Sequence, residues 1–334
     1  MIKAAFIGFG GIAQGAHLPA YQRLEAEGRV KLVAACDIVP ERFEKKVDIN
    51  IGKAVSANED MKTFTDLEEM LGTCEIDLID ICLPTHLHAD MAIAMLERGY
   101  HVISEKPMAR TYEDTRRMLE AAHKARGKLM IGQCLRFFPE YVFLKDAVER
   151  QTYGKVISAR FSRVSNPPVW GFDNWFMDVD KSGGCLLDMH IHDIDMARWL
   201  FGEPQSVSCD ISDVYSGKDI VFSRLNYDGF SVQALGDWSL EGTNFEYGYV
   251  VAFEKATFIC QGGKVMVYPR DSEAYEAALI SGTGVYGELS YFLDVIEGKH
   301  ENIINPPASA SKTVNLIEAL EESSDNGGVP ITFQ

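Results

Sequence analysis

The strongest constraint on the fold of this chain lies in its first 37 residues. An apolar segment, residues 4–7, runs directly into Gly8-Phe9-Gly10-Gly11-Ile12-Ala13, and a helical pattern follows. A second apolar segment, residues 30–36, then ends at Asp37. A G-x-G-x-x-A turn between a strand and a helix, with an acid at the end of the next strand, is typical of a dinucleotide-binding βαβ unit. The alternative is a glycine-rich turn in another kind of α/β protein.

Each residue of this turn has a physical reason to be there. Gly8 allows a tight turn out of the strand, Gly10 leaves room for a pyrophosphate, and Ala13 lets the helix pack closely on the strand. The helix N-terminus offers free N–H groups to the phosphates. Asp37 can accept hydrogen bonds from both hydroxyls of an adenosine ribose, which favours NAD over NADP. The predicted cofactor-binding residues of this unit are Gly8, Phe9, Gly10, Gly11, Ile12, Ala13 and Asp37.

Strands and helices alternate through the first 133 residues. Apolar segments at 78–83, 100–104 and 128–133 are separated by helical patterns at 89–98 and 112–126. This alternation predicts a parallel sheet whose ligands bind at the carboxyl ends of the strands. After residue 134 the chain reads mainly as successive short strands, from 206 to 268. The predicted fold is α/β: a Rossmann domain over residues 1–125, then an α+β domain with a mostly antiparallel open sheet over 126–334.

Composition excludes several classes of partner. The chain has 334 residues, enough for two domains, and its 49 acids against 32 bases give a net charge of −17. That charge repels nucleic acid and anionic membrane surfaces. We see no apolar segment of membrane-spanning length and no export signal. Seven scattered cysteines indicate reduced thiols, so we expect a cytoplasmic protein.

The first candidate catalytic group is Lys106, within Glu105-Lys106-Pro107 at the end of a predicted strand. A lysine followed by proline is held in place by the backbone. Near a nicotinamide, its ammonium could bind a substrate hydroxyl and stabilise a developing alkoxide. The alternative is a lysine in a surface loop.

The second candidate group lies between Asp188 and Asp195, on a helix predicted over residues 187–200. Helical spacing places Asp188, His192 and Asp195 on one side and turns His190 away from Asp188. A histidine oriented by a carboxylate is a typical general base, which makes His192 a candidate for this role. A buried structural histidine is the alternative. Residues two apart on a helix cannot converge on one ion, so we predict no metal at His190-x-His192.

Three other features stay open between function and structure. His86-x-His88 is more consistent with a loop over a cofactor than with a metal site. Arg136 either contacts a ligand or pairs with an acid. The aromatic residues either form an apolar wall of the site or belong to the core; they are Trp170, Phe172, Trp175 and Phe176.

These motifs together resemble the Gfo/Idh/MocA oxidoreductase family over nearly the whole chain. The resemblance rests on the Gly8–Ala13 turn, Cys82-Leu83-Pro84-Thr85-His86-Leu87-His88, Glu105-Lys106-Pro107, and Gly183-Gly184 followed by Asp188-x-x-x-His192-x-x-Asp195. It implies that Lys106, Asp188 and His192 are the catalytic residues. It also implies that Pro84, Thr85, His88 and Glu105 line the nicotinamide end of the cofactor. Leu83, Lys106 and Gln133 complete the predicted set of cofactor-binding residues.

The resemblance further implies an NAD-dependent or, less favoured, NADP-dependent dehydrogenase. Its substrate would be a sugar, cyclitol or related polyol, oxidised at a secondary hydroxyl. A homodimer or homotetramer would form through the sheet of the second domain. Two other classes remain open: a redox-neutral NAD-dependent glycosidase or lyase, and a non-catalytic regulator that senses the cofactor.

Overall fold

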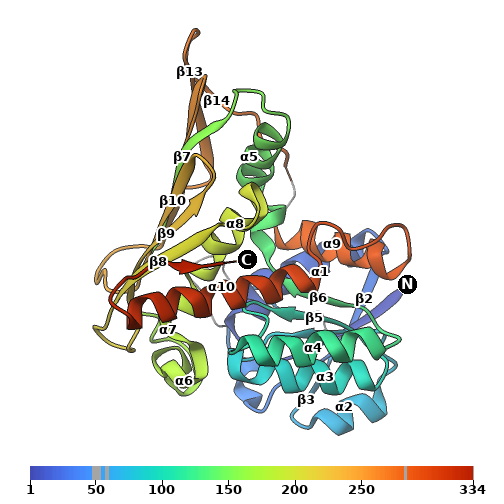
Figure 1. Ribbon diagram of the computed structural model, residues 1–334. Coiled ribbons are helices and arrows are strands. Elements are labelled where there is room, and N and C mark those ends of the chain that lie inside the picture. Colours follow the sequence, from blue (N-terminus) through green and yellow to red (C-terminus); the bar gives the residue numbers. More distant parts are fainter. Residues whose placement is uncertain (47–53, 57–59, 282–283, 334) are drawn as a thin grey trace. The chain divides into compact units, whose positions relative to one another are not determined.

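A computed structural model describes residues 1–46, 54–56, 60–281 and 284–333 (Figure 1). The chain divides into two compact units. The first contains residues 1–134 and 282–311, and the second contains residues 135–281 and 312–334. None of the helices in the described ranges is both long and apolar enough to cross a bilayer.

The first unit is built on a six-stranded parallel sheet, as predicted. Its strand order is β3-β2-β1-β4-β5-β6, the order of a doubly wound dinucleotide-binding fold. That order reverses direction between β1 and β4, where ligands of such sheets bind at the carboxyl ends of strands. The strands are β1 (Ile2–Ile7), β2 (Val30–Cys36), β3 (Lys62–Phe64), β4 (Leu78–Ile81), β5 (His101–Glu105) and β6 (Leu129–Gly132).

Helices and helical turns connect these strands. Asp66 caps α2 by accepting a hydrogen bond from the Glu69 N–H. Thr111 caps α4 in the same way. The elements are η1 (Ala13–His17), α1 (Leu18–Ala26), η2 (Pro40–Phe43), α2 (Leu67–Thr73), η3 (Thr85–Leu87), α3 (His88–Glu97), α4 (Tyr112–Lys124) and α9 (Val285–Ile296).

The first unit is discontinuous in sequence, which differs from the predicted division at residue 125. Strand β6 pairs with β5 and therefore completes the first sheet. Helix α9 also belongs to this unit, although it follows β14 in the chain. Its Leu289 and Phe292 join the same apolar core as Leu18 and Tyr21. Burial of a distant amphipathic helix against α1 is not visible in a local sequence pattern.

The second unit is built on a nine-stranded sheet of order β14-β13-β12-β11-β7-β10-β9-β8-β15. Only the β7–β10 pair is parallel among the pairs described, so the sheet is mostly antiparallel, as predicted. The strands are β7 (Val156–Val164), β8 (Ser206–Ser212), β9 (Ile220–Tyr227), β10 (Phe230–Asp237), β11 (Glu246–Phe253), β12 (Ala256–Gln261), β13 (Lys264–Pro269), β14 (Tyr275–Glu276) and β15 (Ile331–Thr332).

Helices of this unit pack on one face of the sheet. Helix α7 contacts β9 and β10, and α8 contacts β7 and β10 (Figure 1). The helical elements are η4 (Cys134–Phe137), α5 (Pro139–Glu149), η5 (Phe172–Met177), α6 (Val179–Ser182), α7 (Gly184–Asp188), α8 (Ile191–Phe201) and α10 (Pro307–Asp325), of which η4 and α10 also have residues in the first unit.

The predicted continuous helix over residues 187–200 is wrong. The structure has α7, a break at Met189 and His190, and then α8. At the break, the N–H groups of both Met189 and His190 donate to the Cys185 carbonyl, at 3.1 and 2.8 Å. Two donors on one carbonyl interrupt the regular hydrogen-bond ladder, so helical spacing does not carry through from Asp188 to His192.

Candidate functional site

The glycine turn has the geometry that close approach of a phosphate requires. Gly8 has a φ of +89°, and a Cβ there would lie 2.5 Å from the Cys82 carbonyl oxygen. Gly10 meets only the Arg42 guanidinium, whose nearest atom would lie 3.6 Å from an added Cβ. Because a helix leaves its first N–H groups without intrahelical partners, the turn presents donors beside an uncrowded backbone.

Asp37 is buried at the end of β2, as predicted, but it already has several partners. Its Oδ2 accepts hydrogen bonds from the Phe9 N–H at 2.7 Å and from Arg42 Nη1 at 2.8 Å. Its Oδ1 accepts one from the Val39 N–H at 2.9 Å. The carboxylate thus holds the glycine turn, and Arg42 places a positive charge beside it.

The turn after β4 is tied to the turn after β5 by His88. This buried imidazole has Nδ1 2.7 Å from the Pro107 carbonyl oxygen and Nε2 2.7 Å from that of Leu83. Burial lowers the pKa of His88, and the two carbonyls oppose that effect only in part. His88 therefore positions the backbone at Leu83, Pro84 and Pro107. His86, by contrast, is exposed.

Two buried side chains at the strand ends carry polar atoms with no hydrogen-bond partner among the described residues. They are Thr85 Oγ1, after β4, and Gln133 Nε2, after β6. Both side chains are 1% exposed. An unpartnered buried polar atom is costly, so such atoms are typical of a site that a ligand completes. Together with the open backbone at Gly10, they fit a dinucleotide whose nicotinamide lies at these strand ends.

Lys106 directly follows β5 and is partly exposed, whereas Glu105 and Pro107 on either side are buried. The Lys106 N–H donates to Glu105 Oε2 at 3.0 Å. Glu105 Oε1 in turn lies 2.8 Å from His17 Nε2, and His17 Nδ1 lies 2.8 Å from Asp80 Oδ2. Sequence reasoning missed His17 and Asp80, whose ring contact joins residues 63 positions apart.

The side chains of His17, Asp80 and Cys82 lie close enough to hold a metal ion. Hydrogen bonding explains their arrangement instead. Both ring nitrogens of His17 face carboxylates, and Cys82 Sγ lies 3.4 Å from Asp80 Oδ1. Burial and the nearby carboxylates raise the pKa of Cys82 well above its ordinary value.

In the second unit, Asp188 ends α7 and His192 lies in the first turn of α8. Both are partly exposed, while the intervening Met189, His190 and Ile191 are buried. Exposure thus separates these two predicted catalytic residues from the other polar side chains of the segment. Lys106 belongs to the first unit, and Asp188 and His192 belong to the second.

The other acids of α8 are buried in ion pairs. Arg136 binds both carboxylate oxygens of Asp195, at 2.9 and 2.7 Å, and Thr313 donates to Asp195 Oδ1 at 2.8 Å. Arg163 binds both oxygens of Asp193 at 3.1 Å. Of the two roles left open for Arg136, the ion pair is therefore the one observed. Asp195 anchors α8 and does not share an accessible face with Asp188.

His190 is fully buried and faces the sheet. Its Nε2 lies 2.7 Å from Ser223 Oγ on β9, and a Cβ at Gly236 on β10 would lie 2.9 Å from its Nδ1. Burial, with a smaller effect of Arg163, lowers its pKa to about 3. His190 is a neutral packing residue that faces the sheet.

The aromatic segment before α6 divides between core and surface. Phe176 is buried and stacks on Trp175, with ring centroids 3.9 Å apart. Trp170 and Phe172 are 43% and 48% exposed. Asp173 and Asn174 both have positive φ, which turns the chain sharply beside Phe172. The core expectation thus holds for Phe176, while the apolar wall stays a prediction for the exposed Trp170 and Phe172.

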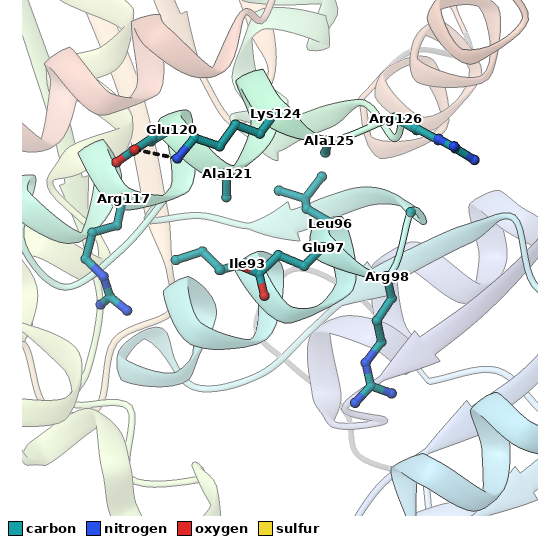
Figure 2. A pocket seen from close by; sticks show the side chains of 11 residues that line it. Ile93, Leu96, Glu97, Arg98, Arg117, Glu120, Ala121, Lys124, Ala125 and Arg126 are labelled. Carbon is teal, nitrogen blue, oxygen red and sulfur yellow. Dashed lines mark hydrogen bonds and ion pairs between the residues drawn. The ribbon is translucent and has the colours of Figure 1, made fainter.

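One hollow in the first unit lies elsewhere, between α3 and α4. Figure 2 shows its lining, which includes Ile93, Leu96, Arg98 and the ion pair of Glu120 with Lys124 at 2.6 Å. Arg98 pairs with Glu68 at 2.6 Å. None of the predicted site residues is among the described residues that line it, and its charges are largely paired. We assign it no role in the site.

Two family models match the chain. One, described as an oxidoreductase family with an NAD-binding Rossmann fold, matches residues 2–133. The other, the GFO/IDH/MocA C-terminal domain, matches residues 141–259.

Curated relatives include a myo-inositol 2-dehydrogenase of Thermotoga maritima, 36% identical over 42% of this chain and 41% of the relative. A 1,5-anhydro-D-fructose reductase of Ensifer adhaerens is 28% identical over 58% of this chain and 55% of the relative. These matches therefore span from about two fifths to just over half of the relatives' length.

Solved structures share the whole fold. A levoglucosan dehydrogenase in complex with NADH superposes with a TM-score of 0.83 at 20% identity, covering 100% of this chain and 99% of the other. The aldose-aldose oxidoreductase of Caulobacter crescentus, complexed with glycerol, has a TM-score of 0.84 at 21% identity, covering 99% of both chains. At such identities the likeness concerns the fold alone.

Proposed function

Because the chain belongs to the Gfo/Idh/MocA oxidoreductase family, with an NAD-binding Rossmann domain, we propose that it is a dehydrogenase of sugars, cyclitols or related polyols. It would oxidise a secondary hydroxyl, or reduce the corresponding ketone. The observation that carries the proposal is the pattern of exposure in the two motifs. Lys106, Asp188 and His192 are partly exposed, while nearly all the polar side chains beside them are buried.

In the first unit, the cofactor site of this proposal consists of the glycine turn, Asp37, and the ends of β4, β5 and β6. The Gly8–Ala13 turn holds the pyrophosphate, and Asp37 faces the adenosine ribose. Thr85 Oγ1 and Gln133 Nε2 have buried polar atoms that a nicotinamide carboxamide can satisfy. When bound, the nicotinamide supplies the hydride acceptor or donor at its C4 atom.

Lys106 supplies the positive charge of the proposed reaction. Its backbone is fixed by Glu105 and Pro107, so the ammonium can hydrogen-bond the substrate oxygen and stabilise charge that develops there. A fixed ammonium at this oxygen supplies the charge stabilisation that a metal ion supplies in other dehydrogenases.

His192 takes the hydroxyl proton in the proposed reaction, and Asp188 orients its imidazole. The supporting observation is that the neighbouring polar groups are used elsewhere. His190 contacts Ser223, while Asp193 and Asp195 pair with arginines. Asp188 and His192 are the polar residues of this segment that remain accessible to a substrate.

The sugar or polyol class rests on similarity to relatives and on the exposed aromatic rings. The names of the relatives include myo-inositol 2-dehydrogenase and levoglucosan dehydrogenase. Trp170 and Phe172 offer aromatic surface of the kind that packs against the apolar face of a sugar ring.

We further propose that a second copy of the chain covers the outer face of the nine-stranded sheet. Ser223 contacts His190 on the helix-covered face, so its neighbour Phe222 points to the opposite face, where it is 56% exposed. Leu235 lies opposite Phe222 on β10, and Val250, Ile259 and Met266 form an apolar row across β11, β12 and β13. Replacing Phe222 and Ile259 by Glu should convert the dimer or tetramer to a monomer, measured by light scattering after size exclusion.

The experiment that tests the proposed activity is a panel of sugars and polyols, including myo-inositol and levoglucosan, with NAD and NADP. Net formation of the reduced cofactor, read by absorbance at its characteristic wavelength, supports a dehydrogenase. Cleavage of a glycoside without net reduction would contradict it in favour of a redox-neutral enzyme. Cofactor binding with no reaction on any substrate would favour a sensing regulator.

A further inference from the structure

One buried cluster in the first unit is not used by the proposed chemistry. His17 is 0% exposed and lies between two carboxylates, Asp80 on β4 and Glu105 on β5, each at 2.8 Å. It ends the π-helical turn η1, which begins directly after the glycine turn. Single π turns inside helices are frequent at functional sites, because they change the direction of the side chains that follow.

The contacts of His17 indicate an imidazolium. Carboxylates only accept hydrogen bonds, so both ring nitrogens must donate for both contacts to be favourable. Burial alone would lower the pKa of His17, but Asp80 and Glu105 outweigh that effect and raise it well above its ordinary value. Burial would raise the pKa of Glu105, yet His17 and Lys106 bring it below its ordinary value. The two positive charges of His17 and Lys106 thus balance the two negative charges of the carboxylates.

The Glu105 carboxylate links His17 to the backbone of Lys106 by hydrogen bonds. One carboxylate oxygen accepts from His17 and the other accepts from the Lys106 N–H at 3.0 Å. On the far side, Gly132 of β6 is paired with Glu105, and a Cβ there would lie 3.4 Å from Glu105 Oε1. The carboxylate is thus held by a charge, by a backbone donor and by close packing.

We infer that His17 is a positioning residue for Lys106, because it holds the Glu105 carboxylate in the one orientation that fixes the backbone of the lysine. This inference rests on the proposed function, in which the Lys106 ammonium acts on the substrate oxygen. His17 itself touches neither substrate nor cofactor. Its role is to keep the turn after β5 from relaxing when the site fills and empties.

The first test is His17→Gln, compared with His101→Gln. At position 17, Gln can still donate to one carboxylate but carries no charge. The control residue, His101, lies at the opposite end of β5, where its ring accepts a hydrogen bond from the Lys128 N–H. We expect His17→Gln to lower kcat by roughly 10- to 100-fold, as small displacements of a catalytic group do, with the Kd for NAD changed less than about threefold. His101→Gln should leave both near wild type.

A second variant separates positioning from stability. His17→Gln leaves Asp80 and Glu105 buried without their counter-charge, which destabilises the fold. Adding Asp80→Asn removes one of these charges and should restore the melting temperature, but not kcat. If kcat recovers together with the melting temperature, or if His17→Gln keeps wild-type kcat, the inference is wrong.

Two further readouts need no substrate. Imidazole 15N chemical shifts should show His17 with both ring nitrogens protonated at pH 8, and amide hydrogen exchange at Lys106 should quicken in His17→Gln. A neutral His17 ring at pH 8 or unchanged exchange at Lys106 would overturn the inference. A wild-type protein inactive on every substrate would instead contradict the proposed function, and these readouts would still decide the role of His17.

Discussion

Each unit buries a histidine near a partly exposed candidate for catalysis, but the two histidines differ in charge. His17, in the first unit, is held between two carboxylates and has a pKa raised well above its ordinary value. His190, in the second unit, contacts Ser223 and has a pKa lowered to about 3 by burial, with a smaller effect of Arg163. Both are 0% exposed. Burial lowers the pKa of both histidines, but for His17 the two carboxylates at its ring nitrogens outweigh that effect, whereas no group in the described part of the chain does so for His190.

The consequence for each site differs as well. In the first unit, hydrogen bonds run from His17 through Glu105 to the backbone of Lys106. In the second, His190 turns toward the sheet while His192 stays accessible, so the buried residue serves packing and its neighbour is available for chemistry. Loss of the buried histidine should thus affect catalysis in the first unit and mainly stability in the second.

The largest expected effect is that of Lys106→Met, which keeps the length of the side chain and removes its charge. We expect kcat to fall by ~100-fold or more, because the lost stabilisation acts mainly in the transition state. NAD binding, measured by titration of protein fluorescence, should survive. Lys106→Arg should rescue poorly, since a planar guanidinium differs in shape from an ammonium. Lost NAD affinity with normal turnover at saturating NAD would refute a catalytic role.

The second prediction concerns the difference in exposure between His190, which is buried, and His192, which is partly exposed. His192→Ala should slow oxidation by ~100-fold or more, the usual contribution of a positioned general base, with little change in NAD affinity. His190→Ala should retain most of kcat but lower the free energy of unfolding by roughly 1–3 kcal/mol, because the Ser223 hydroxyl loses its 2.7 Å contact with the imidazole inside the protein. Steady-state rates and urea unfolding of both variants check this. Equal losses of activity would mean that the two histidines share a role.

The third prediction concerns the cofactor and uses the ion pair of Asp37 with Arg42. Asp37→Ser removes the carboxylate that faces the ribose and releases Arg42 from a 2.8 Å contact, so that the guanidinium can meet a 2′-phosphate. The ratio of kcat/KM for NADP to that for NAD should rise by about 10-fold or more, which corresponds to roughly 1.4 kcal/mol. An intact protein that prefers NADP would contradict the assignment of Asp37.

The fourth prediction follows from the different charge states of the two buried histidines, since His17 is cationic and His190 is neutral. His190 has a folded pKa of about 3 against 6.5 unfolded, so the unfolded chain binds a proton that the folded chain does not. Its contribution to stability is complete above pH 6.5 and falls by about 2 kcal/mol as the pH drops to 5. His17, with a raised pKa, keeps its contribution over this range and loses it only at higher pH.

Urea unfolding at pH 7 and pH 5 measures this effect in the wild type and in His190→Gln. The variant should lose less stability than the wild type on acidification, because it lacks the buried neutral imidazole. An identical loss in both proteins would show that His190 does not set the acid sensitivity of the fold.

Local patterns were sufficient to predict most of the parallel sheet. The glycine turn, the apolar strands and the polar residues at their carboxyl ends are each contained in short segments, and the strand order follows from the fold class. Strand β3 escaped prediction because its three residues carry little apolar pattern. The mostly antiparallel second sheet was likewise visible as a succession of short strands.

The supporting structure around the site could not be predicted, since it depends on distant contacts. His17 meets carboxylates 63 and 88 residues away, and nothing near it in sequence indicates either partner. At the break between α7 and α8, His190 contacts Ser223, which lies 33 residues away in the chain. A helical pattern reports side-chain spacing and carries no information about such a break.

The return of α9 to the first unit has a consequence for how the protein is made. The apolar faces of Leu18, Tyr21 and Leu24 are completed by Leu289, Phe292 and Leu293, which the ribosome adds more than 250 residues later. The core of the first unit therefore stays incomplete while most of the second unit is synthesised. A fragment that stops at residue 134 would expose this surface and tend to aggregate. Although the first unit begins the chain, its core is completed only after residues 135–281 of the second unit have been made.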